Sequence, residues 1–184
     1  PVGGRGGHPV ANDASTRVYL GGGGGAAHQN NLDGGAGGTG GGIVFLVGSG
    51  DVGGTGAIRS NGVNGQDSAD EHRDGGGGGG AGGSVVIIGT NLTGVGLAAI
   101  GGNGGNHMRP IGRFTNEGHG PGGGGGGGGG ATSDGPLTTS VAGGANGVSF
   151  ASTLTEFPPN GATRGATGAT GGVVSFPYPC PRGV

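Results

Sequence analysis

Glycine occurs in this chain in unbroken blocks, and these blocks constrain the fold more than any other feature. Glycine makes up 60 of the 184 residues, and the longest runs cover residues 21–25, 75–80 and 122–130. A glycine has no side chain to bury and loses more conformational freedom on folding than any other residue. The chain is therefore either disordered or held together by hydrogen bonds between closely packed backbone segments.

Collagen and disorder are the alternatives to such a fold. Collagen requires glycine at every third position and abundant proline, whereas this chain has 10 prolines and shows a three-residue beat only in residues 165–171. Disorder is favoured by low hydrophobicity with high net charge, but the net charge is −2 and the apolar residues are clustered. No stretch has a helical period, so we expect almost no α-helix. We expect short buried strands at residues 16–20, 43–47, 84–88, 95–100 and 172–176.

A loose repeat of about 40 residues organises the chain. Each copy has an apolar strand, a tight turn, a small-residue strand, a polar loop and a long glycine run, and the small-residue strands at 56–65 and 96–105 align. A degraded third copy has residues 148–150 and 173–176 as its apolar pieces. We expect one all-β or irregular domain over residues 1–184. It has a core at about 16–176 and extended terminal segments at 1–15 and 177–184.

The expected architecture is a layered sandwich or solenoid of polyglycine-II helices and short β-strands. Such helices have no internal hydrogen bonds, so their peptide groups must pair between neighbours. Each bond contributes a net of only about 0.5–1.5 kcal/mol, against about 1–2 kcal/mol to order each residue. We therefore expect the apolar strands, and a neighbouring copy of the protein, to supply the remaining stability.

Glycine-dominated stretches at 75–83 and 120–130 alternate with short apolar strands and polar loops. In this, residues 20–130 resemble polyglycine-II sandwich domains. One such group is the glycine-rich adhesins at the tips of phage long tail fibres, which implies receptor recognition through loops at one end. Another is the glycine-rich repeats of secreted bacterial surface proteins, similar to residues 79–88 and 99–105 here, which implies an extracellular structural or adhesive role.

Composition and motifs argue against several function classes. The eight basic residues are all arginine and balance ten acidic ones, so we expect no nucleic-acid partner, which would require a basic stripe. No apolar run approaches the roughly 20 residues of a membrane span. The chain has no lysine for a phosphate-binding loop, and its one cysteine, Cys180, has no neighbouring base. We expect no enzymatic activity and no cofactor.

Two polar stretches are candidate contact surfaces. The first contains Asp70, Glu71, His72 and Arg73, and a solvated hairpin tip is favoured there over a cation site formed with Asp67 and Asp74. The second, residues 106–119, is the richest in side chains typical of interfaces; the alternative is a lid over the end of the sandwich. Its candidate contacts are His107, Met108, Arg109, Arg113, Phe114 and His119. The five histidines are expected to be exposed in loops, with gathering at one edge as the alternative.

The C-terminal segment is extended and apolar, with prolines that suit a sheet edge. It can add to a neighbouring subunit or dock on its own domain, through Val173, Val174, Phe176 and Tyr178. The leading hypothesis is a secreted or surface-exposed structural subunit that self-associates into a filament or layer, although no secretion signal is visible. The second is an adhesin that binds a cell-surface receptor through its polar loops. A remote third is ice binding through Thr163, Thr167 and Thr170.

Overall fold

Short strands and long extended segments build the whole described structure. The computed structural model describes residues 3–8, 14–29, 34–69, 74–108, 118–133, 137–150 and 162–171. Within these ranges there is no helix, as expected from the sequence, and so none that could cross a membrane. The strands are β1 (Ile43–Val47), β2 (Val52–Gly53), β3 (Ala57–Arg59), β4 (Ser84–Ile88), β5 (Leu92–Thr93), β6 (Gly96–Ala98), β7 (Gly129–Thr132), β8 (Thr139–Ser140) and β9 (Ala169–Thr170).

The strands form small sheets in which every pair is parallel. The largest has the order β1-β4-β7-β9, the second pairs β3-β6-β8, and the third pairs β2 with β5. The register joins Ile43 to Ser84 and Ser84 to Gly129. Parallel neighbours require a long return connection, and here the glycine-rich segments provide it. Each pass down through one sheet is followed by a turn and a pass back up through the next.

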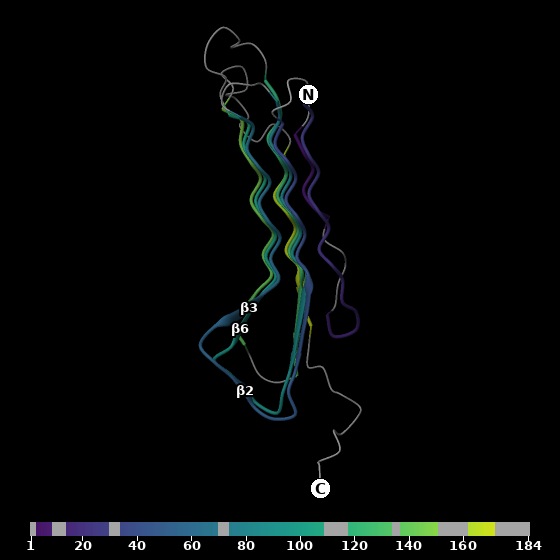
Figure 1. The fold of residues 1–184 in the computed structure, drawn as a ribbon, viewed down its shortest axis with the longest axis vertical. Coiled ribbons are helices and arrows are strands. Elements are labelled where there is room, and N and C mark those ends of the chain that lie inside the picture. Colours follow the sequence, from purple (N-terminus) through teal and green to yellow (C-terminus); the bar gives the residue numbers. More distant parts are fainter. Residues whose placement is uncertain are drawn as a thin grey trace.

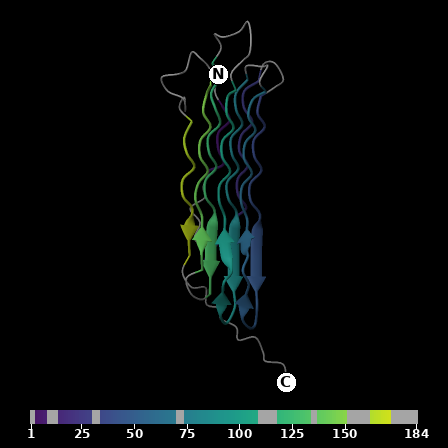
Figure 2. The ribbon, with the colours of Figure 1, turned by 90° about the vertical axis from the view of Figure 1, so that its left-hand side faces the viewer.

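The glycine-rich passes in both directions are extended segments that lie side by side in three rows, seen edge on in Figure 1 and face on in Figure 2. We number them in chain order. The middle row holds segments III, V, VII and IX, a second row holds IV, VI and VIII, and a third holds I and II. Their residues are I 3–8, II 20–29, III 34–42, IV 60–69, V 74–83, VI 99–108, VII 118–128, VIII 141–150 and IX 162–171.

Segment V shows how the rows are held together, because hydrogen bonds join it to six other segments. Its N–H groups donate to carbonyls of II, IV and VII, as in the 2.9 Å bond from Gly78 to Gly25. Its carbonyls accept from I, III and VI, as in the 2.8 Å bond from Gly38 to Gly78. Donor and acceptor directions alternate around the segment, so each peptide group of V can be paired without using a side chain.

Burial along the segments has a three-residue period. In segment III, Gly35, Gly38 and Gly41 are buried, whereas Ala36 and Thr39 are exposed. A period of three is typical of an extended backbone with three residues per turn. Glycine is required on the inward positions because a Cβ atom on Gly80 would lie 2.1 Å from the carbonyl oxygen of Thr39.

Asparagine and aspartate side chains add a second set of bonds on the row of segments IV, VI and VIII. Each accepts a hydrogen bond from a backbone N–H of the next segment, at 2.6–3.0 Å. They also follow the three-residue period, so the side chains form a ladder along the row. The acceptors are Asn61, Asn64 and Asp67 on segment IV, and Asn103 and Asn106 on segment VI.

A small apolar core surrounds β4, which is buried over its whole length. One face packs Val86 and Ile88 against Ala131 and Ala14, and the other packs Val85 and Ile87 with Leu92 and Leu97. β1 was also expected to be buried, but it lies at the edge of the sheet. Its side chains are mostly exposed, with Phe45 at 56% and Val47 at 55%.

Other strand expectations need correction. Residues 16–20 form no strand; instead the backbone of Tyr19 is bonded through its N–H and its C=O to the hydroxyl of the buried Ser84, both at 2.9 Å. The third repeat places the strand β7 at Gly129–Thr132, where no apolar run predicts it. Residues 148–150 contribute only an isolated bridge between Ser149 and His107. Residues 172–176 lie outside the described part.

Candidate recognition end of the bundle

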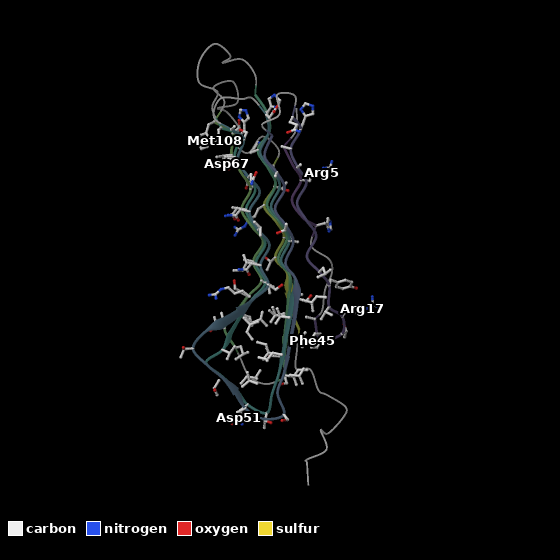
Figure 3. All side chains as sticks on the ribbon, in the orientation of Figure 1. Arg5, Arg17, Phe45, Asp51, Asp67 and Met108 are labelled. Carbon is white, nitrogen blue, oxygen red and sulfur yellow. The ribbon has the colours of Figure 1, made fainter. Side chains whose placement is uncertain are left out.

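One end of the bundle is where four undescribed stretches join the described chain. The flanking residues are 29 and 34, 69 and 74, 108 and 118, and 150 and 162. All of these flanks lie at the end at which segment I begins, opposite the end formed by β2 and β5 (Figures 1 and 2). Alternating segment directions bring them together, because every upward segment ends here and every downward one begins here. Met108 and Asp67 mark this end in Figure 3, and Asp51 marks the opposite one.

Three histidine rings are stacked in a row across this end. His28 closes segment II, His119 opens segment VII, and His107 lies at the end of segment VI. The ring centroids of His28 and His119 are 6.1 Å apart with an interplanar angle of 24°, and those of His107 and His119 are 5.9 Å apart at 10°. His28 is exposed, but His119 and His107 are buried. The expectation of exposed loop histidines is therefore wrong for these two.

His107 is the most constrained of the three. Its backbone N–H donates to Val148 at 3.0 Å and its carbonyl accepts from Phe150 at 3.0 Å, which fixes it against segment VIII. Its Nδ1 lies 3.1 Å from the Ser149 hydroxyl, and its buried Nε2 has no hydrogen-bond partner in the described structure. Burial, and secondarily the charge of His119, lowers the pKa of His107 from 6.5 to about 4. The ring is therefore neutral at neutral pH and is packed inside this end of the bundle.

Two acidic residues of the candidate cation site, Asp67 and Asp74, are described, and they lie in different environments. Asp67 is exposed and its Oδ1 accepts the 2.6 Å bond from the Asn106 N–H, whereas Asp74 is fully buried. Asp70 and Glu71 lie outside the described residues. In the part of the chain that the structure describes, no group of three or more histidine, cysteine or acidic side chains is placed to hold a metal ion.

Only part of the expected contact surface can be located. His107, Met108 and His119 lie together at this end, and the N–H of Met108 donates to the Ser68 hydroxyl at 2.9 Å. The other expected contacts lie outside the described residues: Asp70, Glu71, His72, Arg73, Arg109, Arg113 and Phe114. The same holds for the expected exchange strand with Val173, Val174, Phe176 and Tyr178.

The alternative expectation, that histidines gather at one edge, holds for His28, His107 and His119, but the sequence did not predict their stacking or the asparagine ladder. The ladder has a visible signal, since its members recur at every third position within residues 61–67 and 103–106. The histidine row has no such signal, because His28, His107 and His119 come together only through the packing of segments II, VI and VII.

No protein family matches this chain, and neither a curated protein nor a solved structure is similar to it.

Proposed function

We propose that this protein is an extracellular binding module of the adhesin type. A rod of polyglycine-II-like segments presents polar loops to a cell-surface receptor at one end. The observation that carries the proposal is the position of the described flanks of four side-chain-rich stretches, all at the same end of the bundle. Binding residues are commonly found on loops that a rigid scaffold positions.

The scaffold supports this proposal because backbone groups make most of the hydrogen bonds between its segments. The segments pair through backbone hydrogen bonds, such as those joining segment V to its six neighbours. Loops at the end can therefore change sequence without altering the packing of the rod. The stacked rings of His28, His119 and His107 lie across the same end of the rod.

The experiment compares cell binding of the full chain with a triple variant in which Arg109, Arg113 and Phe114 become alanine. Because arginine and aromatic residues dominate interface energies, we expect binding to fall by at least about tenfold. The matched control replaces Arg17 and Arg59, which are exposed and lie far from the recognition end of the rod (Figures 1 and 3), and should bind as the natural protein does. Equal binding by the triple variant would contradict the proposal.

Self-association into a filament is the second candidate, and the β1 edge favours it. β1 and β9 are the two edges of one parallel sheet, and β1 exposes Ile43, Phe45 and Val47. An exposed apolar edge strand is a template for pairing with another chain. The two edges differ, so pairing one with the other joins copies through a heterologous contact, which gives an open polymer where the rotation between copies does not close a ring. Electron microscopy of the same samples separates the candidates: long polymers support the filament, and discrete particles support the adhesin.

A further inference from the structure

Among the described segments, none occupies one of the positions beside segment VII. Segment V is bonded to six neighbours, whereas segment VII is bonded to five, namely I, V, VI, VIII and IX. Between I and IX runs a groove of about 740 Å³. It is lined by residues 3–8 of segment I, by Pro121, Gly123 and Gly124 of segment VII, and by residues 162–166 of segment IX.

Backbone groups without partners line this groove. Segment VII donates N–H groups to I, VI and IX and offers carbonyls to V and VIII. Around segment V, neighbours that accept hydrogen bonds alternate with neighbours that donate them. By the same alternation, the side of segment VII without a neighbour is the side toward which the carbonyls of Pro121 and Gly124 point. Among the described residues these carbonyls accept no hydrogen bond, and the N–H groups of Gly6, Thr163 and Ala166 donate none. The wall formed by segment VII therefore offers hydrogen-bond acceptors, and the walls formed by segments I and IX offer hydrogen-bond donors.

The space beside Gly123 has the width of one more extended segment. The nearest atoms to a Cβ atom on Gly123 would be the nitrogen of Gly6 at 3.0 Å, the oxygen of Thr163 at 3.6 Å and the Cα of Gly6 at 3.8 Å. Gly78 is the equivalent residue of segment V, and there a Cβ atom would lie 1.9 Å from the carbonyl oxygen of Arg5. Segment I is the backbone that leaves no room for a Cβ atom on Gly78. No described segment occupies the equivalent position beside Gly123.

Segment I provides a template for what fits, because it lies in the same row with the same kinds of neighbour. Its sequence reads Gly-Gly-Arg-Gly-Gly-His over residues 3–8, with Arg5 and His8 exposed. A Cβ atom on any of its glycines would lie 2.0–2.4 Å from a backbone oxygen. An occupant of the groove needs the same spacing, with two glycines facing inward and every third residue facing solvent. Six such residues span roughly 19 Å at about 3.1 Å each.

We propose that the groove binds an extended peptide of another polypeptide, with a Gly-Gly-X repeat in which X is acidic. The charge of X follows from the described lining residues, which include Arg5, His8 and Arg164 but no aspartate or glutamate. The bound peptide comes from a different polypeptide, because none of the undescribed stretches of this chain contains two consecutive glycines. The proposal is independent of the loops at the end of the rod.

Calorimetric titration of the full chain with the synthetic peptide acetyl-(Gly-Gly-Glu)3-amide tests this. We compare the natural protein with Gly123→Ala, whose added methyl group lies in the groove. The matched control is Gly22→Ala, where a Cβ atom would be 4.0 Å from its nearest neighbours on the other side of segment I. We expect the natural protein and Gly22→Ala to bind equally and Gly123→Ala to bind at least about tenfold more weakly. The peptide (Ala-Ala-Glu)3 should not bind.

A charge reversal tests the same proposal if Gly123→Ala fails to fold. Arg5 is exposed, so Arg5→Glu leaves the packing unchanged and should favour (Gly-Gly-Lys)3 over (Gly-Gly-Glu)3. Equal binding of the Glu peptide to all variants, or no binding to the natural protein, would overturn the proposal. So would a dimer in sedimentation that Gly123→Ala dissociates, because the occupant would then be a second copy of this chain.

Discussion

At the scale of the residue, the position of a glycine in the rows decides whether it can be replaced. Gly80 faces the carbonyl of Thr39, which a Cβ atom would approach to 2.1 Å, whereas a Cβ atom on Gly42 would meet nothing within 4 Å. Neither has a left-handed backbone; among the described residues only Gly94 has positive φ, at 69°. The requirement at Gly80 therefore comes from close approach of two backbones.

Alanine at these two positions should have opposite effects on the free energy of unfolding. Gly80→Ala must push segments III and V apart, and we expect a loss of about 1–3 kcal/mol, as for an overpacked core. Gly42→Ala only restricts the unfolded chain, so we expect a gain of about 0.4–1 kcal/mol. Urea denaturation of both variants measures the difference. Equal effects at the two sites would show that contact between the segments is not close.

Titration of His107 should make the protein less stable in mild acid. Its pKa is about 4 in the folded state and 6.5 in the unfolded chain, so between these values the unfolded state binds more protons. The neutral His107 ring therefore makes its full contribution to the free energy of unfolding above pH 6.5. That contribution, at most about 3 kcal/mol, is lost as the pH falls to about 4. Denaturation of His107→Gln across this range should show a shallower slope. The same change at the exposed His8 is the control, and an unaltered slope in His107→Gln would contradict the assignment.

At the scale of the element, apolar strands could be predicted from the sequence and glycine strands could not. The expected strands at 43–47 and 84–88 coincide with β1 and β4, and β6 lies within the expected 95–100. β7 consists of Gly129–Thr132 and becomes a strand because β4 pairs with it. Its partner, not its own propensity, determines its conformation. Residues 16–20 have strand-like composition, but Tyr19 bonds to the Ser84 side chain in place of a neighbouring strand.

Exposure was the less predictable property of each element. β1 and β4 have similar apolar sequences, yet β4 is buried and β1 lies at the sheet edge with Phe45 exposed. A parallel strand rich in Val and Ile is typically buried on both faces. The sequence of residues 43–47 does not show that β1 has a neighbouring strand on one side only. The order of the repeats explains it, because β1 is the first pass of the chain through this sheet.

At the scale of the whole molecule, the sequence of the glycine runs does not show which segments are neighbours or in which register they pair. One glycine in residues 122–130 is equivalent to the next in sequence, so only the flanking strands, such as β4 paired with β7, fix which peptide groups meet. The histidine row depends on that register, which is why His107 and His119 were expected to be exposed but are buried. The groove beside segment VII likewise follows from the arrangement of segments I, VII and IX.

We infer that paired peptide groups of the glycine segments, more than the small apolar core, hold the molecule together. Residue-resolved amide hydrogen exchange in the natural protein can decide this. The bonded amides of segment V, from Gly76 to Gly83, should exchange as slowly as those of the buried strand β4, because both open only on global unfolding. The N–H of Thr163, which donates no bond to another described residue, should exchange rapidly. Exchange of the segment V amides at the rate of an unstructured peptide, with β4 still protected, would contradict the account.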